Sequence, residues 1–308
     1  MPQSRPEVFR RLLFVVNPIS GSIDKKTFIY ALKSLSRELD FDYHYHYTSG
    51  DQDEEALGLL MDSFGPDLLV AAGGDGTINL VARIALKYAC IMSIIPFGSA
   101  NGLAGELLLE TEAVASLKQQ LHAELSYIDV LWVNRRHLCL HLGDVGVNAE
   151  MVARYQHEKV RGWWGYARQL LAAMWRSRAR KFTFHWDGKQ LRKRAHMVVI
   201  ANATSYGTGA LINPEGCIDD GYFEVCIIKR ISLRSFMKVM LARYYKKDRQ
   251  APNIEYIKAQ RLSMRTRRPV RLQLDGEVVG KFQEIDIEAH ARVLPILAPR
   301  RPNPSPAV

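Results

Sequence analysis

Residues 67–77 read DLLVAAGGDGT, an apolar run that ends in a glycine-rich turn. The run Leu68–Ala72 lacks the alternation of a half-buried strand and indicates a strand buried on both faces. The turn Gly73–Thr77 contains three glycines, which permit positive φ angles and let main-chain N–H groups approach a ligand closely. Apolar residues recur at helical spacing between residues 80 and 85. This stretch therefore predicts the strand, loop and helix of a parallel α/β sheet.

The same order repeats on both sides of this stretch. We expect strands over residues 12–16, 41–47 and 91–95, and helices over residues 28–35 and 54–64. Asn17–Gly21 and Pro96–Gly102 are loops that follow two of these strands. Because the carboxyl ends of parallel strands meet at one edge of a sheet, the three loops predict one crevice. Neither a Walker A nor a GxGxxG motif fits them, so we expect a phosphate-bearing ligand that is bound in another way.

Asp75 lies inside the glycine-rich turn, where its charge would repel a phosphate. A carboxylate at this place suits Mg²⁺, bound directly or through water, or a nucleotide hydroxyl. The alternative is a tight strand-to-helix turn in which Asp75 caps the helix. The residues alone leave both interpretations open.

The pattern changes after about residue 130. Short strand candidates separated by turns predict a mostly antiparallel β domain, with helical inserts near 163–176 and 233–245. These strands are expected over residues 130–133, 137–141, 181–186, 196–201, 222–228 and 270–274. We therefore predict an α/β domain over residues 1–131, a β domain over residues 132–297 and a disordered tail over residues 298–308.

Composition limits the class of protein. The chain has 308 residues, and 42 Lys and Arg against 32 Asp and Glu give a net charge of +10. This surplus favours an anionic partner: nucleic acid, anionic lipid headgroups or a phosphorylated ligand. The four cysteines form no CxxC pair, which is typical of buried thiols in a reducing compartment. The apolar run 12–16 is too short for a signal-peptide core, so we expect a cytoplasmic protein.

Five segments in order resemble the diacylglycerol kinase catalytic-domain family, which includes bacterial soluble lipid kinases and the sphingosine and ceramide kinases. They are Asn17–Gly21, Gly73–Thr77, Pro96–Asn101, Asp219–Phe223 and Asp275–Glu277. The resemblance implies an α/β domain with the parallel sheet of NAD kinases and diacylglycerol kinases, and a C-terminal β-sandwich. It also implies a lipid kinase that uses ATP and Mg²⁺, with a diacylglycerol-like acceptor first and a sphingoid base second.

The resemblance also implies roles for individual residues. Glu277 would be the general base toward the lipid hydroxyl, although Asp275-Gly276 by itself indicates a hairpin turn with solvated acids. Asp129 would be either a further acid near magnesium or a structural residue. The metal set would be Cys217, Asp220 and Tyr222, the first and last through backbone carbonyls. The ATP site would contain Asn17, Pro18, Ile19, Ser20, Gly21, Thr48, Gly74, Asp75, Gly76, Thr77, Ile78, Asn79 and Ser99.

Two other functions stay open at this point. The Gly-Gly-Asp-Gly turn is shared with NAD kinases, so phosphorylation of NAD is one alternative. A non-catalytic lipid- or nucleotide-binding regulator is the other. It is suggested by Gly102, since the diacylglycerol kinase branch often has Asp there. With Gly at position 102, the third loop is more similar in sequence to that of the sphingoid-base kinases.

The segment Arg154–Arg194 mixes basic residues with tryptophans. This composition suits an anionic membrane surface, so we expect peripheral association with the inner membrane face. The alternative is a helix that packs its apolar face on the β domain and exposes an ordinary basic face. Without an RNP or KH signature, no nucleic acid is expected. The oligomeric state stays open, with a homodimer as one option.

Overall fold

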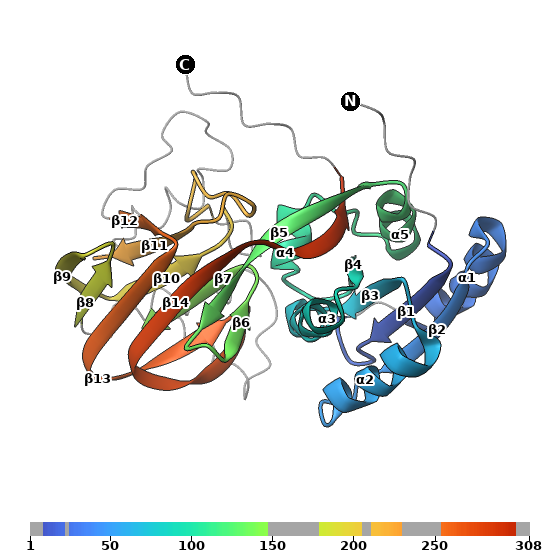
Figure 1. Cartoon of the computed structure of the whole chain (residues 1–308), viewed down its shortest axis with the longest axis horizontal. Helices are drawn as coiled ribbons and strands as arrows, with labels where there is room; N and C mark the ends of the chain where they lie inside the picture. Colours follow the sequence, from blue (N-terminus) through green and yellow to red (C-terminus); the bar gives the residue numbers. More distant parts are fainter. Residues whose placement is uncertain (1–8, 22–24, 147–178, 205–210, 230–253, 300–308) are drawn as a thin grey trace, which may run out of the picture. The chain divides into compact units, whose positions relative to one another are not determined.

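The computed structural model describes residues 9–21, 25–146, 179–204, 211–229 and 254–299 (Figure 1). The chain forms two compact units, one up to Ile128 and again from Val293, the other from Asp129 to Arg292. The expected domain boundary at 131/132 lies close to the first division. The second expected boundary, at 297/298, differs from the second division, which falls before Val293. Residues 293–298 are the end of the strand Glu277–Ala298, and this end of the strand belongs to the first unit.

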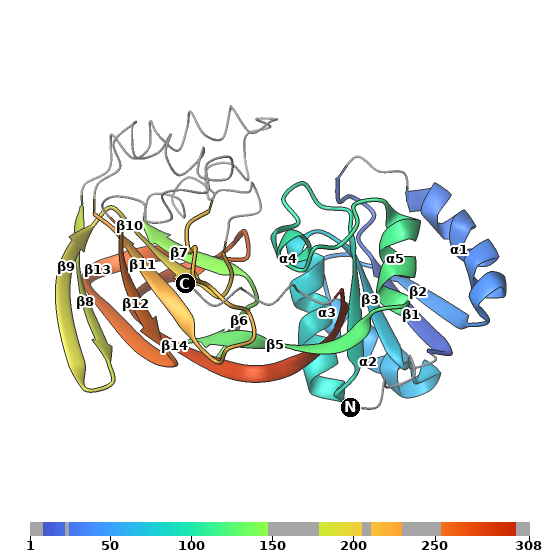
Figure 2. The same ribbon diagram turned by 90° about the horizontal axis from the view of Figure 1, so that it is seen from above.

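The first unit is a parallel sheet between two layers of helices. The strand order is β4-β3-β1-β2, and the end of β14 adds to β4 in parallel through Ile296 and Met92. Helices α1 and α5 contact each other on one face, and α2 and α3 on the other (Figures 1 and 2). The elements are β1 (Arg11–Val16), α1 (Lys25–Leu39), β2 (Asp42–Tyr47), α2 (Asp53–Phe64), β3 (Leu68–Gly73), α3 (Asp75–Tyr88), β4 (Ile91–Pro96), α4 (Gly102–Glu106) and α5 (Ala113–Leu121).

The sequence pattern explains this sheet. Every residue of β3 is buried, and so is every residue of β1 after Arg11. A strand that is covered on both faces needs apolar residues at every position, which explains the continuous apolar runs in the sequence. On one face Phe14 packs edge-on against Phe28 of α1, and Phe28 packs in the same way against Phe97. The parallel α/β fold expected for this half is confirmed.

The second unit is built from antiparallel strands, as expected. Its strand order is β12-β11-β10-β7-β13-β14, while β8 pairs with β13 and β9, and β5 pairs with β14 and β6. The strands are β5 (Glu124–Val133), β6 (His137–Cys139), β7 (Leu142–Gly146), β8 (Arg180–Trp186), β9 (Lys189–Ala195), β10 (Met197–Ala201), β11 (Phe223–Ile228), β12 (Ile254–Ala259), β13 (Arg261–Leu274) and β14 (Glu277–Ala298).

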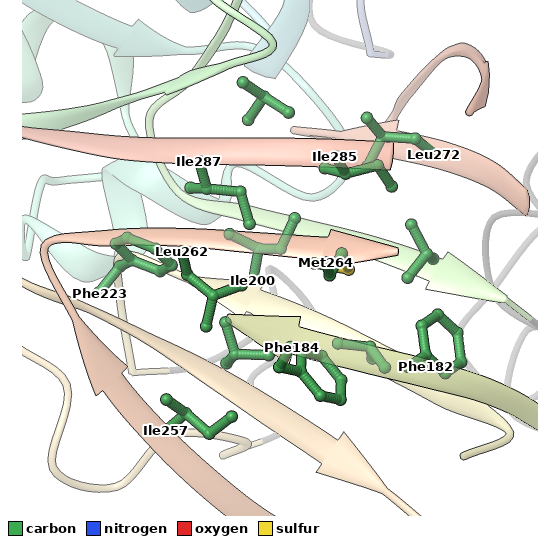
Figure 3. Packing of buried hydrophobic residues seen from close by; sticks show 14 of the residues in the cluster. Phe182, Phe184, Ile200, Phe223, Ile257, Leu262, Met264, Leu272, Ile285 and Ile287 are labelled. Atoms are coloured by element: carbon green, nitrogen blue, oxygen red, sulfur yellow. The ribbon is translucent and has the colours of Figure 1, made fainter. Parts of the chain in front are cut away.

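The core of this unit lies where alternate residues of these strands face one another. Figure 3 shows Phe182 and Phe184 of β8 near Met264 and Leu262 of β13, with Ile285 from β14 in the same cluster. The burial pattern of β13 alternates along Arg261–Thr266, with Leu262, Met264 and Thr266 buried. This is the period of two that a sheet with one buried face requires.

Several strands were not expected from the sequence. β9 reads KQLRKRA, whose outward residues are charged, so it was assigned to the basic segment. β14 runs for 22 residues with mixed polar and apolar positions, and the sequence pattern predicted no strand there. The helical inserts expected near 163–176 and 233–245 lie outside the described residues, as do residues 154–178 of the basic segment. In the part that is described, no helix is long and apolar enough to cross a membrane.

Asp53 fixes the loop that leaves β2. It is buried, and its carboxylate accepts hydrogen bonds from the N–H groups of Ser49 (2.9 Å) and Gly50 (2.8 Å) and contacts His46 Nε2 at 3.2 Å. Burial raises the pKa of Asp53, but these hydrogen bonds outweigh it, and the pKa lies below its ordinary value of 3.8. Thr48, an expected ATP-site residue, lies directly before this loop.

We predict that Asp53→Asn lowers the free energy of unfolding at neutral pH by about 1.5–3 kcal/mol, the range for hydrogen bonds to a charged group. Because the folded-state pKa is depressed, this stabilisation is present above the ordinary pKa and is lost as the pH falls through the folded value. Urea unfolding at pH 7 and near pH 3 measures it. Glu55→Gln, an exposed acid in the same helical turn, is the control. A difference between wild type and Asp53→Asn that does not shrink in acid would contradict this account.

Candidate functional site

The three loops predicted from the sequence meet at one edge of the first sheet. Gly98 donates its N–H to the carbonyl oxygen of Gly73 at 3.2 Å, and Phe97 donates to the same oxygen at 2.9 Å. The Asn17 N–H donates to the Ala72 carbonyl at 3.0 Å. These bonds join the loops after β1, β3 and β4 through main-chain atoms, so the expectation of a shared edge is confirmed.

Glycines make this approach possible. A Cβ added to Gly98 would lie 2.5 Å from the Cα of Gly74, and one added to Gly21 would lie 2.0 Å from the carbonyl oxygen of Phe97. A Cβ on Gly73 would lie 2.3 Å from the hydroxyl oxygen of Thr77. Contacts this short do not occur between real atoms, so a side chain at Gly21 or Gly98 would push two loops apart, and one at Gly73 would displace Thr77 within its own turn. The glycines of the motif therefore set how closely the loops pack.

Helix α3 begins at this junction. Gly74 is its N-cap, and the first-turn N–H groups of such a helix carry a partial positive charge and attract anions. Asp75 is the first helical residue, and its Oδ1 accepts the N–H of Gly102 at 3.0 Å. Asp75 therefore positions the start of α4 in the third loop. This contact is none of the roles considered for Asp75 from the sequence, which were a ligand to Mg²⁺, a partner of a nucleotide hydroxyl and a cap of the helix that follows the turn.

The other expected ATP-site residues differ in exposure. Thr77 and Ile78 are buried, and Ile78 belongs to the packed face of α3. Pro18, Ile19 and Ser99 are exposed, with Ile19 at 87%. Ser20, Thr48, Gly74, Gly76 and Asn79 are partly buried, as are Asn17 and Asp75. Buried Thr77 and Ile78 thus pack inside the unit, whereas the other expected residues are at least partly accessible to solvent.

The first loop is held by its own side chains. Asn17 accepts the N–H of Ile19 on its side-chain oxygen at 3.0 Å, and the Ser20 hydroxyl donates to the Asn17 carbonyl at 3.0 Å. Gly21 ends the loop with φ +55°, a left-handed angle that favours glycine. The side chain of Asn17 therefore stabilises the local fold of this loop.

Sequence reasoning did not consider Tyr45 and Tyr47, two exposed aromatic residues of β2. Their rings lie 5.3 Å apart in an edge-to-face arrangement, and Tyr47 directly precedes Thr48. The signal was present, since residues 41–47 alternate aromatic and polar side chains, but it was used only to predict a strand.

In the second unit, Asp275 and Gly276 form the hairpin turn between β13 and β14. Both have positive φ angles, 47° and 90°, as a two-residue hairpin requires. Asp275 is not a solvated acid, because its carboxylate accepts N–H groups from Leu140 (2.8 Å), His141 (3.0 Å) and Leu142 (3.2 Å). The expectation of a turn is confirmed, and that of solvated acids holds only for Glu277, which is exposed at the start of β14.

The loop of residues 217–222 precedes β11. Cys217 donates its thiol to Asp219 Oδ1 at 2.9 Å, and Asp220 accepts the Tyr222 N–H at 2.9 Å on one oxygen. Its other oxygen lies 2.6 Å from Nζ of Lys258. The three expected metal residues therefore lie on one loop, where the Cys217 thiol contacts Asp219 while the Asp220 carboxylate and the Tyr222 ring both contact Lys258. Among the described residues no group of three or more His, Cys, Asp or Glu side chains is arranged to hold a metal ion.

Asp129 is hydrogen-bonded to the main chain of this loop. It is completely buried, and its carboxylate accepts the N–H groups of Gly221 (2.6 Å) and Arg292 (2.7 Å). Burial raises the pKa of Asp129, while these two hydrogen bonds lower it in part. Of the two roles considered for Asp129 from the sequence, these contacts favour the structural one.

A separate cleft of about 920 Å³ lies elsewhere in the second unit. It is lined by Trp132, Trp186, Arg261 and Glu288 among others. None of the residues expected to bind ATP, metal or the acceptor lines it, and it has no counterpart in the sequence analysis.

Comparisons with known proteins agree with this geometry. Residues 11–133 match the diacylglycerol kinase catalytic domain, and residues 144–298 match the YegS C-terminal NAD kinase beta sandwich-like domain. A diacylglycerol kinase of Staphylococcus saprophyticus is 25% identical over 279 residues, covering 89% of this chain and 90% of its own length. One from Bacillus subtilis is 25% identical over 294 residues, covering 92% and 96%.

Solved structures show the same fold. A diacylglycerol kinase from Bacillus anthracis superposes with a TM-score of 0.76 at 20% identity, covering 97% of this chain and 99% of its own. The catalytic-domain match ends in β5, and the β-sandwich match, which takes in half of the chain, begins in β7. With both domains present in this order over most of its length, the chain belongs to the diacylglycerol kinase family.

Proposed function

We propose that this protein is a lipid kinase that transfers the γ-phosphoryl group of ATP to a lipid hydroxyl. A diacylglycerol-like acceptor is our first choice and a sphingoid base our second. The observation that carries the proposal is the meeting of three glycine-containing loops at the N-terminus of α3. Family membership and the names of the relatives support the same reaction.

The nucleotide would bind to the loops of the first unit. Phosphates fit the α3 N-terminus, where main-chain N–H groups and the helix dipole favour negative charge without a basic side chain. Asn17–Gly21 and Ser99 flank this junction, and Thr48 follows the neighbouring strand, with its N–H bonded to Val16 at 2.9 Å. Mg²⁺ would enter with ATP as part of the substrate and neutralise charge on its phosphates.

The acceptor would be activated by Glu277. In this reaction the bond between the γ-phosphorus and the bridging oxygen of ATP breaks, and a bond forms from the lipid oxygen to phosphorus. The lipid hydroxyl proton needs an acceptor, and the exposed Glu277 carboxylate would take it. Asp275 supports this as a positioning residue, because its three N–H contacts fix the hairpin from which Glu277 projects.

We predict that Glu277→Gln lowers the rate of phosphate transfer by about 10²–10⁴-fold, since amide nitrogen cannot accept the proton. The measurement is transfer of labelled phosphate from ATP to diacylglycerol, monoacylglycerol, sphingosine and ceramide in mixed micelles, with NAD as a soluble acceptor. The matched control is Glu284→Gln, another carboxylate of β14 that pairs with Arg265 at the surface, which should retain activity.

The same assay separates the alternatives. Labelled NAD without labelled lipid would mean an NAD kinase. ATP binding with no labelled product would mean a non-catalytic regulator, the case for which is that residue 102 is Gly and its N–H is already bonded to Asp75. Equal transfer by wild type and Glu277→Gln would remove Glu277 from the proposed mechanism.

We also propose that the protein works at the cytoplasmic face of a membrane and contacts anionic lipid through the basic hairpin of β8 and β9. Lys181 of β8 lies directly opposite Arg194 of β9, and Thr183 lies opposite Arg192. All three cations are exposed. Like charges opposite each other in a sheet are destabilising, and an anionic surface would relieve that repulsion.

Reversal of Arg192 and Arg194 to Glu should weaken binding to phosphatidylglycerol-containing vesicles at least ~10-fold, because each basic group near such a surface contributes about 1 kcal/mol. Vesicle sedimentation at low and high salt measures this. Reversal of Lys33 and Lys87, exposed on helices of the first unit, changes the net charge equally and serves as the control. Equal loss in both double variants would mean that only overall charge matters and would refute the hairpin as the contact.

A further inference from the structure

The loop of residues 217–222 has a weak set of potential metal ligands. Cys217 and Tyr222 could contribute only their main-chain carbonyls, because a thiol and a phenol are poor ligands for Mg²⁺, so Asp220 alone offers a charged oxygen. Both oxygens of that carboxylate have partners in the structure. One accepts the main-chain N–H of Tyr222, and the other accepts a hydrogen bond from the ammonium group of Lys258.

The sheet register brings Lys258 to this place. β11 and β12 are antiparallel, and Glu224 lies directly opposite Lys258. Side chains of directly opposite residues share one face of a sheet, so Lys258 extends along the face that carries Glu224. Its Nζ lies 2.6 Å from Asp220 Oδ2 and 3.5 Å from Glu224 Oε1. It also lies 5.3 Å from the centre of the Tyr222 ring, in a cation–π arrangement.

One ammonium group thus contacts three residues of the loop and the strand that follows it. Glu224 is buried, only 5% exposed, and its other oxygen accepts the side-chain N–H of Asn213 at 2.6 Å. A buried carboxylate needs a nearby cation or several hydrogen bonds, and Lys258 and Asn213 supply both.

A second side-chain cation holds the other end of the loop. Nε of Arg292 donates to the main-chain carbonyl of Asp219 at 2.8 Å, so this carbonyl has a protein partner. Arg292 also donates its main-chain N–H to Asp129, which in turn binds Gly221. The loop is therefore connected to β12 by Lys258 and to β14 by Arg292, on the two sides of Asp219 and Asp220.

We infer that Lys258 serves as the built-in cation of this loop, in place of the divalent ion that the family resemblance implies at Cys217, Asp220 and Tyr222. The second unit then needs no resident metal ion to fix residues 217–222. Any Mg²⁺ requirement of catalysis belongs to the ATP complex alone. This inference concerns the folded state without nucleotide, so it does not depend on the proposed kinase reaction.

The test measures the thermal midpoint, Tm, of the nucleotide-free protein in EDTA and in millimolar MgCl₂, by circular dichroism. For wild type we expect the same Tm in both, and no bound Mn²⁺ by electron paramagnetic resonance. Lys258→Met keeps most of the aliphatic stem and removes the charge. It should lower Tm in EDTA by roughly 2–4 °C. Part of that loss should return with MgCl₂, because the vacated carboxylates accept the ion. Lys258→Arg should stay near wild type in EDTA.

Lys229→Met is the matched control. Lys229 forms an ion pair with Glu255 of the same strand β12, so its loss removes a comparable surface charge away from the loop. Its Tm should not respond to MgCl₂. Three results would overturn the inference: a wild-type Tm that rises with MgCl₂, one equivalent of Mn²⁺ bound by wild type and lost in Asp220→Asn, or a Lys258→Met protein as stable as wild type. The wild-type measurements decide the question even if Lys258→Met does not fold.

Discussion

The proposed nucleotide site depends on a contact of main chain against main chain, where the loops after β3 and β4 meet. Gly98 approaches Gly74 so nearly that a Cβ on Gly98 would lie 2.5 Å from the Gly74 Cα. The buried strands bring the loops to one edge, and the absence of side chains lets them close on each other. Only then does the N-terminus of α3 face the same region as the first and third loops. The proposed phosphate site depends on this contact more than on any one charged residue.

In the second unit, two carboxylates fix loops by accepting hydrogen bonds from main-chain N–H groups. Asp275 accepts three successive N–H groups and so fixes the turn before Glu277. Asp129 does the same for Gly221 and Arg292 from a fully buried position. In both cases an acid that could be taken for a catalytic or metal-binding group has its hydrogen-bonding capacity committed to structure. Glu277, in contrast, is exposed and available for chemistry.

Much of the first unit could be predicted, because buried parallel strands are continuous apolar runs and their loops carry Gly, Asn and Pro. The second unit was harder. β9 has charged residues outward and β14 mixes polar and apolar positions over 22 residues, so neither has a clear period. The partners of Asp75, Asp220 and Asp275 could not be predicted at all, since Gly102, Lys258 and Leu140 reach them only through tertiary packing.

If glycine packing of the loops in the first unit makes the nucleotide site, the affinity for MgATP must depend on the residue at position 98. Calorimetric titration with MgATP of Gly98→Ala and Gly105→Ala tests it most directly. A Cβ at Gly105, an exposed residue of α4, meets no atom within 4 Å, whereas one at Gly98 meets Gly74 and Asn101. We expect at least ~10-fold weaker binding, about 1.4 kcal/mol, for Gly98→Ala and unchanged binding for Gly105→Ala. MgATP binding by Gly98→Ala with wild-type affinity would contradict it.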